Sequence, residues 1–457
     1  MRGIRVSQVI GLVLATIVAV GCGGGGNTAA VNNPPPATQS AMAQIKFGDA
    51  PADSIVAFEL TVNSVVLHSS AGDVSVLASP TRIELIHNAG NFEPLALRNI
   101  PAGAYTGATI TVADPEVKVI GSTGQPVELA ATLASNTANV TFSPAITVAS
   151  SPLVINFDLN VAASVAISGN TATVTPTFTA SSNPVAQNEN EQEVEDGEVE
   201  VTGAVASAGG NSFSINVDQA SQSLTFTTDS STQFESPLTG VGSLTVEMIV
   251  EVHAVTQSDG SLLARKVEAE VEGADGLEVE GLVVSTTGSP VTQFVMVVQD
   301  ETTPSSSAPA IGANVTVNLD GNTRFRLRSD KVDLSNLPFT PTFDASTLSV
   351  AQRVEVDTDT SAASTITADK VKLQEQALTG VVSGYTPNGS QASFTLTVAS
   401  DSAFARLTGL TTLTVFQQPS TRLKNLSAVS NGATVRVRGL LFSNSGFKLV
   451  AERIGTP

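Results

Sequence analysis

One pattern of short segments recurs three times, in the same order, in the second half of the chain. Each copy opens with apolar residues around a glycine, and these glycines are Gly203, Gly281 and Gly380. The spacings of 78 and 99 residues are too long for a solenoid, whose repeats run to about 20 to 50 residues. The recurrence therefore predicts a row of three small homologous domains.

The segments that follow each glycine indicate β structure. They are a strand that begins with phenylalanine, a Thr-x-apolar element and a closing strand around an alanine, and they lie at Phe213, Phe294 and Phe394, at Thr232, Thr323 and Thr421, and at Ala264, Ala368 and Ala451. Five or six short strands in about 70 to 95 residues suit a small OB-like barrel, in which a glycine permits a sharp bend. The glycines could instead mark bulges in an open sandwich. The sequence leaves both forms open.

Alternation predicts which faces of the strands are buried. In residues 244–253 the even positions are apolar, and the odd positions are mostly polar. This pattern is typical of a strand with one face on a core and one face in water. We therefore expect Glu251 and His253 to be exposed.

Composition supports an all-β chain. Charged residues make up 14% and aromatic residues 4% of the 457 residues, and Trp is absent. No sustained helical period with capping residues is visible, and a β-branched, small and polar composition favours strands joined by turns. The prediction is an N-terminal antiparallel β-sandwich followed by three antiparallel repeats.

The N-terminal domain shows the same period of two. Residues 56–63 and 153–161 alternate apolar and polar side chains, and residues 101–103 (Pro-Ala-Gly) provide a turn between them. The motifs at 48–53 (GDAPAD), 65–68 (VVLH), 82–86 (RIELI) and 101–105 (PAGAY) resemble the bacterial domain-of-unknown-function family 4382. The repeats resemble family 5666 over residues 198–455. These resemblances imply an envelope location and a β fold, and they supply no catalytic residues.

The predicted boundaries divide the chain into seven parts. They are a signal peptide (1–21), an acylated cysteine with a Gly- and Pro-rich tether (22–40), the sandwich (41–180), an acidic linker (181–197) and the repeats at 198–274, 275–375 and 376–457.

The start of the chain resembles a bacterial lipoprotein signal. Two arginines precede an apolar run from Val9 to Val20, and residues 19–22 (Ala-Val-Gly-Cys) hold the only cysteine. Small residues before Cys22 suit cleavage there, after which the thiol and the freed amine would carry diacylglycerol and a further chain such as palmitate. An ordinary secretory signal with an incidental cysteine is the alternative. We expect a lipid-anchored protein of the bacterial cell envelope, and Gly23 favours sorting to the outer membrane, on its periplasmic side or at the cell surface.

Candidate metal ligands are few. Asp49 and Asp53 could bind a calcium ion, but carboxylates beside Ala-Pro more often form turns. Residues 187–200 carry seven acidic side chains without the ligand order of an EF-hand, so a solvated linker is the favoured interpretation. The sequence thus predicts no cofactor or metal, with calcium at Asp49 and Asp53 as the alternative.

The motifs of catalysis are missing from the sequence. His68, His87 and His253 are the only histidines, and G-x-S-x-G, P-loop and dinucleotide motifs do not occur. We expect the histidines to be exposed and predict no catalytic residues. A carboxylate pair like that of glycosidases remains an alternative among the 42 acidic residues, although Trp for stacking on sugars is absent.

Charge limits the partners. The formal net charge is −20 and the pI is about 4.4, which argues against binding the phosphates of nucleic acids. The sequence predicts a structural or partner-binding protein of the adhesion type, with a protein or polysaccharide ligand and a membrane contact through its lipid. A carboxylate-based carbohydrate-active enzyme and a periplasmic assembly factor are the alternatives. The oligomeric state is left open.

Overall fold

The structure is a computed structural model of the whole chain. It describes residues 40–457, except 51, 89–91, 186–197, 218–219, 272–275, 303–308, 328–331, 360–361, 363 and 390. The predicted signal peptide, Cys22, the tether up to residue 39 and most of the acidic linker lie outside the described residues. Within the described part, no helix is both long and apolar enough to span a bilayer.

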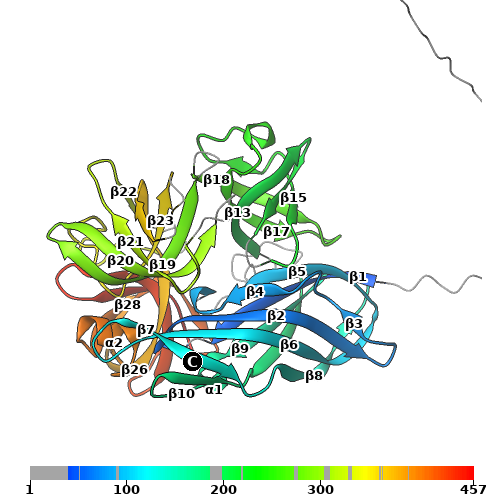
Figure 1. The fold of residues 1–457 in the computed structure, drawn as a ribbon, viewed down its shortest axis with the longest axis horizontal. Helices are drawn as coiled ribbons and strands as arrows, with labels where there is room; N and C mark the ends of the chain where they lie inside the picture. Colours follow the sequence, from blue (N-terminus) through cyan, green and yellow to red (C-terminus); the bar gives the residue numbers. More distant parts are fainter. Residues whose placement is uncertain are drawn as a thin grey trace, which may run out of the picture. The chain divides into compact units, whose positions relative to one another are not determined.

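The first domain consists of two β-sheets (Figure 1). One sheet has the order β12-β9-β1-β5, and the other has the order β10-β11-β7-β6-β2-β3, with β4 on β2 and β8 on β6. The elements are β1 (Ser40–Ala50), β2 (Ile55–Ser69), β3 (Val74–Ser75), β4 (Thr81–Glu84), the 3-10 helix η1 (Ile86–Asn88), β5 (Phe92–Pro101), β6 (Gly103–Ile120), β7 (Pro126–Leu133), β8 (Thr137–Val148), β9 (Leu153–Asn160), α1 (Val161–Ser164), β10 (Val165–Ser168), β11 (Thr171–Val174) and β12 (Phe178–Pro184).

Alternating residues of both sheets form the core of this sandwich. Phe58 and Leu60 of β2 and Ile155 and Phe157 of β9 are fully buried in one apolar cluster, as the alternation predicts. The prediction of a purely antiparallel sandwich is wrong in one respect, because β1 pairs with β9 and β11 pairs with β7 in parallel. Alternation reports which face a side chain occupies and carries no information on strand direction.

The third repeat is a closed five-stranded barrel. Its order is β26-β27-β28-β30-β29, with β28 and β30 parallel. The elements are β26 (Glu375–Asn388), β27 (Gln391–Val398), α2 (Ala403–Thr408), β28 (Thr412–Lys424), β29 (Thr434–Phe442) and β30 (Lys448–Gly455). Numbered within the repeat, the strand order is 1-2-3-5-4, so of the two forms that the sequence left open this repeat takes the OB-like barrel. The parallel pair β28–β30 departs from the predicted antiparallel repeats, for the same reason as in the sandwich.

The first repeat has the same strand order. Its sheet runs β15-β14-β13-β17-β18-β16, and an additional pairing of β15 with β18 completes the ring. The elements are β13 (Glu198–Gly209), β14 (Ser212–Asn216), β15 (Leu224–Thr227), β16 (Gln233–Phe234), η3 (Val241–Ser243), β17 (Ile249–Thr256) and β18 (Leu262–Val271).

The second repeat divides its last strand in two. β21 pairs with β24, and β25, which follows β24 after two residues, pairs with β22 and β23. The elements are β19 (Leu277–Gly288), β20 (Val291–Thr302), β21 (Asn314–Asn318), β22 (Arg324–Leu327), β23 (Arg353–Thr358), β24 (Thr365–Thr367) and β25 (Lys370–Leu373).

The recurring glycines allow the first two strands of each barrel to approach closely. A Cβ atom at Gly281 would lie 2.2 Å from the carbonyl oxygen of Val297, and at Gly380 it would lie 2.5 Å from that of Thr397. Gly203 has the same relation to its neighbouring strand. A side chain at these positions would therefore push two hydrogen-bonded strands apart.

The recurring threonines and alanines form one hydrogen bond that all three repeats share. The hydroxyl of Thr421 donates to the carbonyl of Ala451 at 2.7 Å and accepts from the amide of Gln418 at 2.8 Å. Thr232 and Thr323 donate in the same way to the carbonyls of Ala264 and Ala368. Two of the four sequence signals that defined the repeats are thus the donor and the acceptor of one hydrogen bond.

The domains pack together through apolar side chains. Val56, Ala57 and Ile120 of the sandwich form a buried cluster with side chains of the second and third repeats, namely Val284, Val297 and Ala403. The second and third repeats share a further cluster that includes Leu440 and Phe442. The sandwich and the second and third repeats therefore have apolar contacts between them.

Candidate functional site

Two rows of charged side chains cross the second repeat. In the ladders of β19, β23 and β25, Glu278 lies opposite Asp357, which lies opposite Lys370. Two residues along, Glu280 lies opposite Glu355, which lies opposite Lys372. The valines between them, Val279, Val356 and Val371, are fully buried in the barrel core. Because successive side chains point to opposite faces of a strand, the charged rows lie on the outer face.

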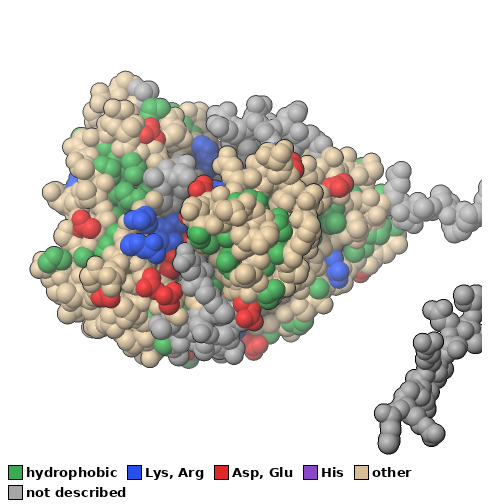
Figure 2. Space-filling model, turned by 90° about the horizontal axis from the view of Figure 1, so that it is seen from above, with side chains coloured by type: hydrophobic (Ala, Val, Ile, Leu, Met, Phe, Trp, Pro, Cys, Tyr) green, Lys and Arg blue, Asp and Glu red, His purple; other side chains and the backbone are tan. Residues whose placement is uncertain are grey.

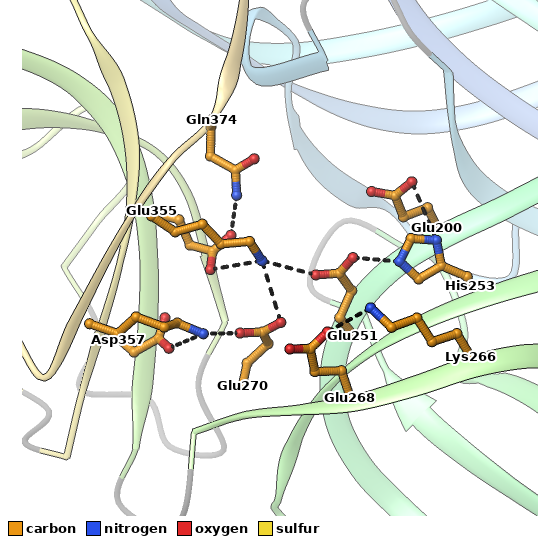
Figure 3. A network of polar contacts seen from close by, with 11 residues as sticks. Glu200, Glu251, His253, Lys266, Glu268, Glu270, Glu355, Asp357 and Gln374 are labelled. Carbon is orange, nitrogen blue, oxygen red and sulfur yellow. Dashed lines mark hydrogen bonds and ion pairs between the residues drawn. The ribbon is translucent and has the colours of Figure 1, made fainter. Parts of the chain in front are cut away.

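Strands of the first repeat cover this face. Glu251 of β17 and Glu270 of β18 are both buried, and Figure 3 shows their carboxylates directed toward Glu355 and Asp357 of the second repeat. Nζ of Lys372 lies 3.3 Å from Oε2 of Glu251 and 3.4 Å from Oε1 of Glu355. The junction of the first two repeats is therefore a buried network of carboxylates and amines.

Lys370 is the second cation of this network. Its Nζ lies 2.6 Å from Oδ2 of Asp357 and also pairs with Glu270. Burial disfavours the charged form of Glu270, but Lys372 and Lys370 outweigh burial and lower the pKa of this carboxyl to about 2. Burial and the neighbouring Glu355 raise the pKa of Asp357 well above its usual value.

Four carboxylates of this network lie close enough together to share a ligand. Oxygen atoms of Glu270, Glu278, Glu355 and Asp357 lie within 4.8 Å of one another, and all four residues are buried. Burial and the charges of Glu355 and Glu270 raise the pKa of Glu278 well above its usual value. Sequence reasoning missed this group, because its members come from two domains. The one sequence feature that corresponds to this group is the presence of acidic and basic residues at matching positions of neighbouring strands in the second repeat.

The structure contradicts the predicted exposure of the odd face of β17. The core positions Val250 and Val252 are buried as predicted, but Glu251 is buried too, beneath the second repeat. Nε2 of His253 lies 2.7 Å from Oε1 of Glu251, and the His253 side chain is only 14% exposed. Alternation finds the polar face of a strand and does not show that a neighbouring domain covers it.

The histidines of the first domain also differ from the prediction. His87 is buried, and its ring lies between the carboxylates of Glu84 and Glu93, at 3.1 Å and 2.9 Å. Burial alone would lower the pKa of His87, but the two carboxylates raise it well above its usual value. His68 is partly exposed, as predicted, and contacts Thr109 and Asp73.

Asp49 and Asp53, the residues of the calcium alternative, are both held within the fold. Asp49 is buried in β1. Oδ2 of Asp53 accepts a hydrogen bond of 2.7 Å from the amide of Thr379, and its backbone carbonyl accepts one from the amide of Ala403. Burial raises the pKa of Asp53 to about 6. Asp53 therefore joins the sandwich to the third repeat, and calcium at these residues stays the alternative to the prediction of no metal.

A small cavity lies beside Asp53. Its volume is about 70 Å³, and its lining comes from the sandwich and from the second and third repeats, including Val56, Gln299 and Phe404. Pockets for small molecules usually measure about 300 to 1,000 Å³. The cavity is thus of a size for a few water molecules.

Two family models match parts of the chain. Residues 40–174 match the model of the domain of unknown function DUF4382, and residues 202–268 and 280–372 match that of DUF5666. One segment that matches DUF4382 thus precedes two segments that match DUF5666. The third repeat lies outside the matched residues, yet its strand order and its Thr421 hydrogen bond are those of the DUF5666 repeats.

Comparisons with individual proteins add little. No curated protein matches the chain. A Drosophila structure described as Unr CSD456 is 13% identical, with a TM-score of 0.13 over 55% of this chain and 95% of the other. A Streptococcus pneumoniae multidomain protein with nucleic acid binding domains is 11% identical, with a TM-score of 0.11 over 55% and 73%. At these scores neither likeness supports an argument.

Proposed function

We propose that the chain is a lipid-anchored protein of the bacterial cell envelope with a structural or partner-binding role. The observation that carries this proposal is the use of polar side chains to join domains. Asp53 binds the third repeat, and the lysines of the second repeat bind carboxylates of the first. The sequence at residues 19–22 supports the anchor. Domains joined in this way suit a protein that presents a surface.

The surface supports a partner other than nucleic acid. Figure 2 shows one face on which uncharged surface predominates and acidic side chains are scattered, and the largest group of basic side chains on it is small and lies next to acidic ones. A site for a phosphate backbone requires a basic stripe or groove. With a net charge of −20, a neutral or cationic surface of a protein or polysaccharide is the better complement.

The placement of the carboxylates argues against the glycosidase alternative. The two carboxylates of a glycosidase must flank a sugar bond in an open cleft. The group formed by Glu270, Glu278, Glu355 and Asp357 is buried in the described structure, where a polysaccharide has no access. This supports a binding or structural role over hydrolysis.

Metabolic labelling with an alkyne analogue of palmitate tests the anchor. The wild-type chain should take up the label and sediment with membranes, whereas Cys22→Ser should do neither. Ser150→Cys, which places a thiol in an exposed loop, is the matched control and should leave labelling at the level of the wild type. Label on Cys22→Ser, or a soluble wild-type protein, would contradict the proposal.

Protease treatment of sealed cells then separates the two sides of the membrane. Loss of the folded domains would place them at the cell surface and support binding of an external ligand. Protection, with a periplasmic marker intact, would support a role in envelope assembly.

A further inference from the structure

The four clustered carboxylates have the dimensions of one coordination shell. Oxygen ligands lie about 2.3 to 2.6 Å from Ca²⁺, so two oxygens on opposite sides of the ion are about 4.6 to 5.2 Å apart. One oxygen each of Glu270, Glu278, Glu355 and Asp357 lies within 4.8 Å of the other three. Four oxygens at these separations can therefore contact the same ion.

Glu278 supplies an independent sign of a missing ligand. Its Oε2 atom is buried and has no hydrogen-bond partner among the described residues, and the residue is only 8% exposed. Glu278 also lies directly opposite Asp357 in the ladder of β19 and β23, where like charges repel. A buried carboxylate without a partner is strongly unfavourable. The site thus lacks either a proton or a cation.

The charges of the surrounding groups favour a divalent cation. Lys370 contacts Glu270 and Asp357, and Lys372 contacts Glu270, Glu355 and Glu251. Two amines thus face the four clustered carboxylates, which leaves two negative charges. Glu251 is shared with His253, and the neutral side chain of Gln374 donates to Glu355.

We propose that Glu270, Glu278, Glu355 and Asp357 bind one calcium ion between the first and second repeats. Carboxylate oxygens are ligands for hard cations, and a cage made largely by protein suits Ca²⁺ better than Mg²⁺, which retains several waters. Glu270 belongs to the first repeat, and the other three ligands belong to the second. The ion therefore links two domains, and its binding is independent of the lipid anchor.

Calcium titration of the full mature chain tests this site. After treatment with a chelator, the protein should bind one Ca²⁺ by calorimetry, and native mass spectrometry should count the same single ion. Glu278→Gln keeps the shape of the side chain and removes its charge, so it should weaken calcium binding at least tenfold. Glu268→Gln is the matched control, because Glu268 lies two residues from Glu270 on β18 and pairs with Lys266 instead. This control should bind calcium like the wild type.

The temperature of thermal unfolding is a second test, because calcium should reverse the order of stability of the wild type and Glu278→Gln. In chelator, Glu278→Gln should unfold at the same temperature as the wild type or at a higher one, since it removes an unpaired buried charge. In calcium, the wild type should unfold at the higher temperature. Failure of the wild type to bind calcium, or equal binding by Glu278→Gln, would overturn the proposal and assign a proton to Glu278. Mass spectrometry of the wild type decides the matter if the variant does not fold.

Discussion

The sandwich and the repeat junction each bury a charged cluster, but only the cluster in the sandwich satisfies its central carboxylate. Glu84 accepts hydrogen bonds of 2.7 Å from the amides of Phe58 and His87 and also pairs with the His87 ring. Glu278, in the junction, has an oxygen with no partner. The difference shows that buried charge can fix a loop inside one domain or create a site between two domains.

The largest expected effect comes from breaking the satisfied cluster. Glu84→Ala leaves Nδ1 of His87 and the amide of Phe58 without their acceptor, in a position that is fully buried. Removing one partner of a buried charged pair costs about 3 to 5 kcal/mol. The urea midpoint of unfolding should fall accordingly. Glu116→Ala, at a carboxylate that is 57% exposed, is the control and should cost less than about 1 kcal/mol. If both changes lowered the stability equally, the buried position of Glu84 would not be the cause of the loss.

A change of pH should have a smaller effect on the free energy of unfolding, because in this cluster it removes the charge of His87 and leaves all side chains in place. The raised pKa of His87 means that the folded chain binds this proton more tightly than the unfolded chain does. Its contribution to stability is complete below about pH 6.5, the unfolded value, and is lost as pH rises through the folded value. The lowered pKa of Glu93 acts in the opposite direction, so its contribution is lost as pH falls below about 4.5.

Unfolding by urea between pH 6 and pH 9 measures this linkage. The wild type should lose stability over this range more steeply than His87→Gln, which cannot take up the proton. His68→Gln, at a partly exposed ring, controls for the substitution itself. Parallel curves for the wild type and His87→Gln would show that the Glu84 cluster does not hold a charged imidazole.

The smallest loss of stability is expected from removing a hydrogen bond between uncharged groups. This loss is the reference against which the effects of the charged clusters are compared. Thr421→Val removes the hydroxyl that bridges Gln418 and Ala451 while keeping the branched shape. The expected cost is about 1 kcal/mol, measured by the same urea midpoint. Thr421→Ser keeps the hydroxyl and should recover most of the loss. A cost near that of Glu84→Ala would mean that charge is not what distinguishes the clusters.

Much of the fold could be predicted from the sequence, because the determining signals are local. Alternation placed Phe58, Leu60, Val250 and Val252 in cores, and the recurring glycines and threonines identified three related β repeats. Strand direction was missed at the β1–β9 pair, since parallel and antiparallel neighbours show the same alternation.

The charged clusters could not be predicted, because they depend on contacts between segments that are distant in the sequence. Glu251 has the pattern of an exposed residue, yet it is buried where Lys372 of the second repeat contacts it. His87 follows a strand that ends at Glu84, and the sequence does not reveal that Glu93 closes over its other side. The sequence does place acidic residues on one strand and basic residues on a neighbouring strand, but this pattern does not show that the strands of another domain lie against them.

The hydrogen bonds of Asp53 close the chain into one long loop. Its carboxylate accepts from the amide of Thr379, 326 positions away, and its carbonyl accepts from the amide of Ala403. The first and second repeats lie between Asp53 and Thr379 in the sequence. Separating the sandwich from the third repeat therefore requires both hydrogen bonds to break.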